Sequence, residues 1–382
     1  MNKKKYVNRN YLTTTRIIAL GFLITVIVGT ILLSLPIASA NGTWTDLLTA
    51  AFTSTTSVCV TGLVVVDTFS YWSLFGKGVI LILIQIGGLG IVSIITLFML
   101  LFRMKITLKS TMLLQDAFNL NSKQGLLKFT IKVIKGTFLI EGIGAFIYSF
   151  YYCREYGLLK GIWFSVFHAV SAFCNAGLDI MGADSLIPYH SNLLMMLNTS
   201  FLIIMGGIGF IVWWDTVEAF RRIRTKKCSI RSAWNGVHLQ TKIAIFMTLL
   251  LLIGGTVVIY FLERSNPDTL GNLSEKDRIL NAFFQSVTLR TAGFAAVPQA
   301  ALRPVTAFFG ALLMMIGGSP VGTAGGMKTV TIAVIFFTFA AMIRNHEDTE
   351  VFKRNIPVSV VKKAVAIVFL SMSTIFIMTI LL

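Results

Sequence analysis

The chain has 382 residues, of which 55% are hydrophobic and 13% are charged. Soluble domains are about 25% charged, and apolar runs of about 20 residues, long enough to cross a bilayer, recur along the whole chain. No long polar stretch indicates a separate soluble domain. The composition therefore excludes an ordinary soluble protein and predicts an all-α polytopic membrane protein.

The net charge of +17 would indicate nucleic-acid binding in a soluble protein, but here the basic residues cluster between the apolar runs. Positive charge marks cytoplasmic segments. We therefore expect a multi-pass protein of the cell (plasma) membrane, with a cytoplasmic N-terminal segment (1–16) and no nucleic-acid partner. The clusters are Lys3, Lys4, Lys5, Arg9 and Arg16; Arg103, Lys105, Lys109, Lys123 and Lys128; Arg221–Arg231; and Arg344, Lys353, Arg354, Lys362 and Lys363.

The first apolar run, Ile17–Leu35, follows basic residues as the core of a signal peptide does. It is longer than the roughly 7–15 residues of such a core, so we expect an uncleaved first span. The cysteines and histidines form no pattern typical of a metal site or a nucleophile. A membrane enzyme, the alternative class, would need ionisable residues that converge at membrane depth, and Glu141 and His168 are isolated. We expect no enzyme activity and no bound cofactor.

Three short Phe-rich runs are amphipathic and too short to cross a bilayer. They are Leu47–Leu63, Ile162–Leu178 and Ile279–Phe294, and each closes on a triplet that ends in glycine. The final glycines, Gly62, Gly177 and Gly293, lie 115 and 116 positions apart. A constant period over three segments indicates an internal repeat, which fixes the architecture.

The flanks of the three runs repeat as well. An apolar span precedes each run (Ile17–Leu35, Ile131–Tyr151, Ile243–Leu262) and another follows it (Gly78–Leu101, Leu193–Trp213, Val305–Ala341). The unit is thus span, half-helix, glycine loop and span, and we expect units at 17–102, 127–220 and 241–343. With the N-terminus inside, each half-helix enters and leaves from the outside as a re-entrant loop. The following spans also carry the glycine clusters "QIGGLG", "MGGIG" and "IGGSP", which alone are typical of close helix packing.

Non-helical backbone at membrane depth persists only inside protein or beside water. Carbonyl oxygens freed at such a bend can replace the hydration shell of a cation. Glycine permits the unusual dihedral angles, and the C-terminal end of a half-helix adds a favourable negative dipole. Because the loops hold few acidic side chains, carbonyl coordination of a monovalent alkali ion is favoured over calcium binding.

The motifs "TSVCVTGLVVVDT", "SAFCNAGLDIMG", "SVTLRTAGF" and "GGSPVGTAGGMKT" resemble those of the Trk/Ktr/HKT superfamily of potassium transporters, and most closely the Ktr-type ion-translocating membrane subunit. The resemblance covers essentially the whole chain. It implies four span–pore-helix–span units around a central pore, and potassium uptake that is often stimulated by sodium. It also implies a homodimer in membrane lipid, bound to a cytosolic nucleotide-binding regulatory ring.

The resemblance assigns backbone coordination of potassium to three triplets, one in each unit. The filter residues are Val60, Thr61 and Gly62; Asn175, Ala176 and Gly177; and Thr291, Ala292 and Gly293. Each loop has a single glycine, so we expect weaker discrimination between potassium and sodium than in a two-glycine filter.

The segment "GGSPVGTAGGMKT" (317–329) interrupts the last span of the third unit, and the resemblance implies an intramembrane gating loop there. The expected gate residues are Gly317, Gly318, Gly322, Gly325, Gly326 and Lys328. Lys328 has three interpretations: it obstructs the ion path, it anchors the loop, or it snorkels to the inner face. Arg290, one position before the third triplet, either braces the pore loop through carbonyls or lies exposed at the mouth.

The period predicts a fourth filter glycine near position 408, from 293 plus about 115. The sequence ends at Leu382, and we interpret 359–382 as the first span of a fourth unit. Two explanations stay open: a fragment or truncated gene, or a separate chain that supplies the missing part. The alternative function is accordingly a truncated, non-conducting subunit, or the partner of an intact paralogue.

Overall fold

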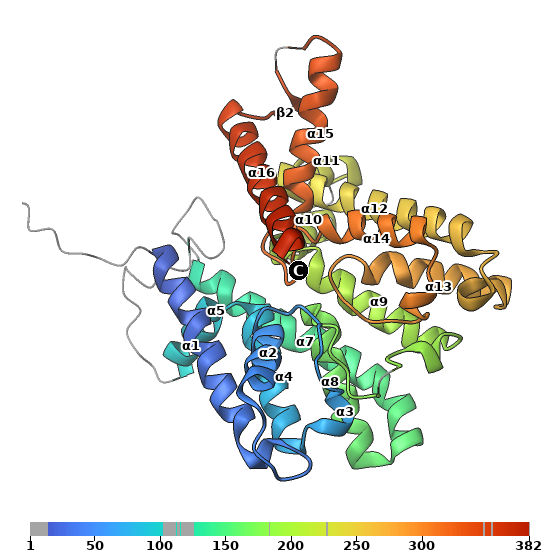
Figure 1. The fold of residues 1–382 in the computed structure, drawn as a ribbon. Helices are drawn as coiled ribbons and strands as arrows, with labels where there is room; N and C mark the ends of the chain where they lie inside the picture. Colours follow the sequence, from blue (N-terminus) through green and yellow to red (C-terminus); the bar gives the residue numbers. More distant parts are fainter. Residues whose placement is uncertain are drawn as a thin grey trace, which may run out of the picture.

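The structure, a computed structural model, describes residues 14–101, 112, 115, 126–182, 184–226, 228–346, 348–352 and 354–381. In this part of the chain the secondary structure is helical, as predicted, apart from two strands of two residues each (Figure 1). Several predictions lie outside the described residues: those about 1–13 and those about Arg103, Lys105, Lys109, Lys123 and Lys353.

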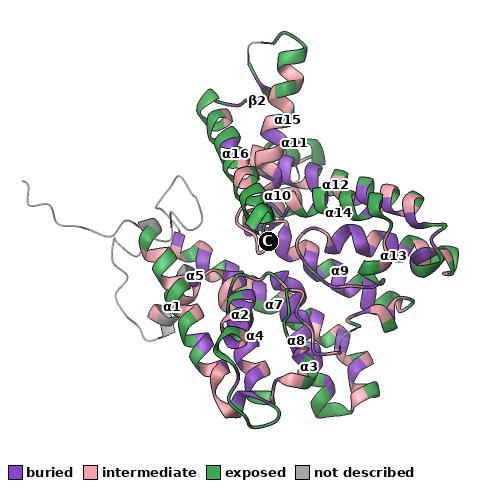
Figure 2. Ribbon diagram, viewed as in Figure 1, coloured by how far each residue is buried: buried purple, intermediate pink, exposed green. Residues whose placement is uncertain are grey.

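Four helices of the described residues are long and apolar enough to cross a membrane. They are α1 (Thr14–Ser34), α7 (Leu126–Tyr156), α12 (Leu239–Glu263) and α16 (Val358–Leu381). Figure 2 shows that their outer faces are largely exposed, and only 6% of the apolar window of α16 is buried by protein. Such apolar faces suit contact with lipid, because a helix satisfies its own backbone groups.

Three half-helices follow the first three spans: α2 (Leu47–Val58), α8 (Leu158–Cys174) and α13 (Glu275–Thr288). Each packs on the span before it, and α8 and α13 also contact the second span of the preceding unit. Side-chain caps fix where α2 and α13 begin. Asp46 accepts from the backbone N–H groups of Leu48 and Thr49, and Ser274 accepts from that of Asp277.

The second spans of the first two units are not continuous, contrary to the prediction of single spans at Gly78–Leu101 and Leu193–Trp213. Each breaks at a glycine with positive φ, Gly90 at 78° and Gly209 at 96°. The second pair is bent by 97°. The segments are α4 (Leu74–Leu89) and α5 (Ile91–Leu101), α9 (Leu193–Gly207) and α10 (Phe210–Lys226), and α14 (Pro304–Met315) and α15 (Thr329–Ile343).

The glycine clusters of these spans also serve close packing. A side chain on Gly87 would collide with the carbonyl of Val58, and one on Gly206 with the carbonyl of Phe173. The ends of α2 and α8 therefore rest directly on the backbones of α4 and α9, which holds the filter loops in place.

Short elements complete the chain, and the sequence predicted none of them. The antiparallel hairpin of β1 and β2 is a small departure from the all-α expectation; it closes the turn between α15 and α16, which pack together. The elements are α3 (Thr68–Tyr71), α11 (Ile230–Asn235), β1 (Glu350–Val351), β2 (Arg354–Asn355), the 3-10 turns Pro36–Ala38, Ile187–Tyr189 and Gln299–Ala301, and the π turn Pro267–Gly271.

Candidate ion-binding site

The three glycine loops meet at one place, although their glycines are more than a hundred positions apart in the sequence. A Cβ atom added to Gly293 would lie 3.3 Å from the Cα of Gly177 and 4.0 Å from the Cα of Gly62. A Cβ on Gly62 would lie 2.6 Å from the carbonyl oxygen of Ala176. The loops thus present backbone to one another with no room for side chains between them.

The three triplets share one backbone conformation. The first residue has positive φ in each: 54° at Val60, 59° at Asn175 and 67° at Thr291. The closing glycines, Gly62, Gly177 and Gly293, have φ of 81°, 64° and 94°. Non-glycine residues seldom adopt this region, and each instance costs of order 1–3 kcal/mol. The same strained backbone conformation therefore recurs at the equivalent position of all three loops.

A hydroxyl group from the last turn of each half-helix fixes the residue that follows the filter glycine. Thr56 Oγ1 accepts from the N–H of Leu63 at 3.0 Å. The hydroxyl of Ser171 donates to the carbonyl of Leu178, and Thr288 Oγ1 donates to that of Phe294 at 2.7 Å. These hydroxyls hold the loop ends without using the carbonyl groups of the triplets.

The segment 317–329 lies between α14 and α15 and is anchored to the second unit. Ser319 N–H donates to the carbonyl of Gly207 at 2.8 Å, and Thr323 N–H donates to that of Gly206 at 3.0 Å. Thr323 Oγ1 also donates to the carbonyl of Phe173, at the end of α8. The loop thus bonds to the backbone of the broken span α9–α10.

The same loop is joined to the third filter by two polar contacts. Gly325 N–H donates to Thr291 Oγ1 at 2.9 Å, and Arg290 Nη2 donates to the carbonyl of Gly317 at 3.4 Å. Arg290 is 6% exposed, so its interpretation as an exposed residue at the mouth is wrong. Its bond to Gly317 agrees with a bracing role, although that carbonyl belongs to the segment 317–329 and not to the pore loop. Lys328 Nζ donates to the carbonyl of Ala324 at 2.6 Å, a hydrogen bond within the segment itself.

A carboxylate follows the second filter. Asp179 accepts from Ser185 Oγ at 2.6 Å and from the N–H of Met181 at 3.2 Å. Burial raises the pKa of the Asp179 carboxyl to about 6; these two hydrogen bonds lower it, and the charge of Asp67 raises it further. The prediction of filter residues missed this group, although it lies two positions beyond Gly177.

The two isolated ionisable residues, Glu141 and His168, each contact neighbouring side chains. Glu141 contacts the side-chain amide of Gln85 at 3.1 Å, and His168 stacks on Phe294 at 4.9 Å between ring centroids. Among the described residues, no group of three His, Cys, Asp or Glu side chains could hold a metal ion.

The match to a family of known proteins extends over the whole of these units. A family model described as "TrkH: Cation transport protein" matches residues 3–382. The chain belongs to this family. The family is one of membrane transporters rather than enzymes, in agreement with the apolar spans.

Two relatives place the chain more closely within the TrkH family, and a solved structure shares its fold. It is 38% identical over 365 residues to the potassium/sodium uptake protein NtpJ of Enterococcus hirae, which covers 96% of this chain and 78% of that protein. It is 36% identical over 377 residues to the Ktr system potassium uptake protein B of Bacillus subtilis, covering 98% and 81%. The potassium transporter TrkH from Vibrio parahaemolyticus has the same fold, with a TM-score of 0.68 at 16% identity over 100% of this chain and 73% of that one. The resemblance to the Trk/Ktr superfamily is confirmed.

Proposed function

We propose that this chain takes up potassium across the cell membrane through a path lined by the main-chain carbonyl groups of the filter triplets. The observation that carries the proposal is the convergence of Gly62, Gly177 and Gly293, each at a positive φ, where only backbone fits between the loops. Carbonyl oxygens freed from helical bonding can replace the water around a cation. Inward movement of potassium down the membrane potential releases about 2.3 kcal/mol per charge per 100 mV.

The names of the relatives extend the proposal to sodium and to a partner. NtpJ is named for potassium and sodium uptake, and we propose that sodium stimulates or accompanies transport here too. The Bacillus relative is named as one protein of a Ktr system, and we propose a cytosolic regulatory ring as partner of a homodimer. We also propose that the N-terminus and the turn between α15 and α16 lie in the cytoplasm, because the segments that connect the spans there are rich in lysine and arginine.

The loop 317–329 is proposed as the gate, because its hydrogen bonds join the third filter to the second unit. Arg290 holds the start of the loop through the carbonyl group of Gly317, and Lys328 bonds to the carbonyl group of Ala324 within the loop. Deletion of 317–326 should raise potassium flux in a folded protein. The predicted fourth filter loop concerns residues beyond this sequence and stays a prediction.

Flux of potassium into proteoliposomes tests the filter with a matched pair of glycine variants. Gly177 has φ of 64°, and a Cβ there would collide with the carbonyl of Ala292. Gly42 has φ of 68° in an exposed loop with nothing within 4 Å of its Cβ position. Both alanine variants carry the same backbone cost of about 1–2 kcal/mol, but Gly177→Ala also reshapes the filter.

We expect Gly177→Ala to abolish potassium flux and Gly42→Ala to leave it unchanged. Equal flux in the two variants would contradict the assignment of the filter. Absence of flux in the parent chain, with correct folding, would favour the non-conducting alternative. Flux ratios for potassium and sodium, measured in the same vesicles, test the expectation of weak discrimination.

A further inference from the structure

An apolar groove lies between α10, α11 and α12, away from the filter and the gate. It has a volume of about 520 Å³ and is lined by side chains that include Phe220, Ile223, Ile230, Trp234 and Ile245. This volume falls within the range of about 300–1,000 Å³ of sites that hold small molecules. Ile230 is 77% exposed and Phe220 is 68% exposed, so large apolar surfaces border an open groove.

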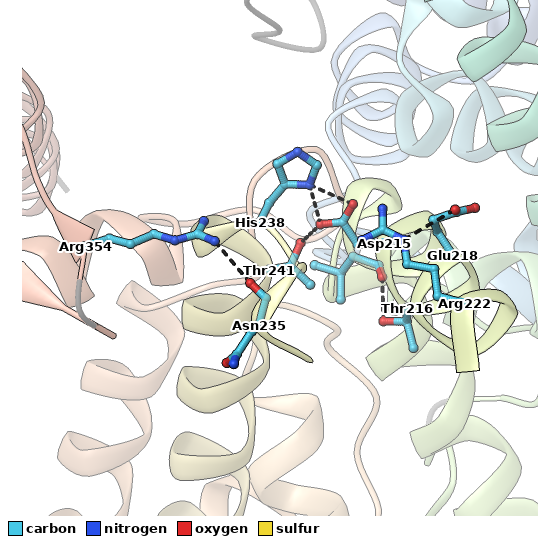
Figure 3. A network of polar contacts seen from close by, with 9 residues as sticks. Asp215, Thr216, Glu218, Arg222, Asn235, His238, Thr241 and Arg354 are labelled. Atoms are coloured by element: carbon cyan, nitrogen blue, oxygen red, sulfur yellow. Dashed lines mark hydrogen bonds and ion pairs between the residues drawn. The ribbon is translucent and has the colours of Figure 1, made fainter. Parts of the chain in front are cut away.

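A polar network fixes the walls of the groove relative to one another. Figure 3 shows Asp215 of α10 facing His238 and Thr241 at the start of α12. His238 Nδ1 lies 2.9 Å from Asp215 Oδ1, and Thr241 Oγ1 donates to Asp215 Oδ2 at 2.5 Å. Residues 215 and 238 are 23 positions apart, so these bonds tie the two helices across α11. The groove is therefore preformed.

Several arginine residues are close in the sequence to the lining positions of the groove. Arg222 and Arg224 on α10 and Arg231 on α11 flank the lining positions on their helices, and the acidic residues of α10 are Asp215 and Glu218 alone. Asp215 is engaged in the network, and Glu218 Oε1 lies 3.5 Å from Arg222 Nε. Arg224 and Arg231 are exposed and have no ion-pair partner among the described residues.

Two further cations converge on a single carbonyl at the end of α11. Lys242 Nζ donates to the carbonyl oxygen of Asn235 at 3.4 Å. Arg354 Nη2 donates to the same atom at 3.2 Å, as Figure 3 shows. Like charges so close repel each other unless an anion or a helix end lies beside them. The carbonyl at the end of α11 offsets part of this repulsion, and the two cations add positive charge next to Trp234 and Thr241, which line the groove.

The groove lies at the boundary of the bilayer. Thr241 and Ile245, in the first two turns of the apolar span α12, line it, and Trp234 borders it with 41% exposure. Tryptophan favours the interface between headgroups and acyl chains. In the orientation of the proposed function, on which this step rests, the boundary is that of the cytoplasmic leaflet.

We propose that this groove binds an anionic phospholipid, with an acyl chain against Phe220, Ile223 and Trp234 and the phosphate among the flanking arginines. Basic pockets between membrane helices on the cytoplasmic side are suited to anionic headgroups. The apolar floor and the basic rim match the two halves of one lipid molecule. A protein helix would need no such basic rim, and a free phosphate would not need the apolar floor.

Quenching of Trp234 fluorescence by brominated lipids tests the proposal on the reconstituted 382-residue chain. Brominated phosphatidylglycerol and brominated phosphatidylcholine are compared, and the signal of a Trp234→Phe variant is subtracted to isolate this residue. Arg224→Gln/Arg231→Gln removes two rim charges. The matched control is Lys362→Gln/Lys363→Gln. It removes two exposed charges near the N-terminal end of α16, outside the groove.

We expect Trp234 to be quenched more strongly by phosphatidylglycerol. Each arginine near an anionic headgroup contributes about a fivefold preference, so the double arginine variant should lower the preference by about 5- to 25-fold and the lysine variant should leave it unchanged. Equal quenching by the two lipids, or an equal loss in the lysine variant, would overturn the proposal. So would absence of Trp234 quenching by either lipid, which would indicate that protein covers the groove. Potassium flux is not measured, so the result is independent of the proposed filter.

Discussion

The contact between the third filter and the gating loop can be removed by one nearly isosteric change, Thr291→Val. Thr291 Oγ1 accepts the backbone N–H of Gly325 at 2.9 Å. Valine keeps the shape of the side chain and removes the acceptor. It also tolerates the backbone here, because Val60 occupies the equivalent position of the first loop with φ of 54°, against 67° at Thr291.

The expected effect follows from the environment of the lost bond. Gly325 is exposed, so water can replace the lost acceptor and the loss corresponds to an ordinary hydrogen bond of about 0.5–1.5 kcal/mol rather than to a buried unsatisfied group. If the bond holds the gating loop in its closed position, the closed state is weakened by about 2- to 12-fold relative to open states. Potassium flux should rise by up to that factor.

Flux into proteoliposomes, normalised to folded protein, measures this change. Thr256→Val is the matched control, because Thr256 Oγ1 bonds only to the carbonyl of Leu252 within α12. We expect Thr323→Val, which loses the bond to the carbonyl of Phe173, to act in the same direction as Thr291→Val. Unchanged or lower flux in both loop variants, with normal folding, would refute the gate as described.

Two further predictions concern groups outside the filter. The raised pKa of Asp179, about 6, leaves its carboxyl neutral below that pH and negative above it, so cation entry should increase as external pH rises from about 5 to 7. Asp179→Asn should abolish this rise, whereas Asp268→Asn, at an exposed site, should preserve it. Glu263 accepts from Asn266, Thr269, Thr306 and the N–H of Arg303, so Glu263→Ala should lower the free energy of unfolding by about 2 kcal/mol or more. Glu275→Ala, which removes an exposed pair with Arg278 and a hydrogen bond from Tyr260, should lower it by no more than about 1 kcal/mol in the same thermal unfolding assay.

The spans and half-helices were accessible from the sequence because lipid imposes simple requirements on length and composition. A run of apolar residues either crosses the bilayer or does not. The breaks at Gly90 and Gly209 were not accessible, because a glycine cluster serves close packing and chain reversal equally well. The structure shows both roles in the same clusters. Gly87 and Gly206 pack against the carbonyls of Val58 and Phe173, and the helices break at Gly90 and Gly209.

Long-range polar contacts were beyond the sequence for a different reason. Arg290 and Gly317 are 27 positions apart, and their contact depends on how the gating loop folds back toward the third filter. The basic run Arg221–Arg231 looked like a solvated connection, since the six-residue helix α11 has no periodicity long enough to recognise. Asp215 and His238 belong to different helices, and no local sequence pattern predicts that α10 and α12 bring them into contact.

The identity of the residues that open each filter triplet supports backbone chemistry over side-chain chemistry. Val60, Asn175 and Thr291 share the left-handed conformation, yet their side chains are an alkyl group, an amide and an alcohol. Valine has no oxygen, so side chains cannot supply an equivalent ligand in the three loops. Two of the three are also β-branched, for which this conformation is a marked outlier. A strained geometry kept at three equivalent places with three chemically different side chains points to the peptide groups as the shared element. We infer that the strain turns their carbonyls toward the proposed ion path.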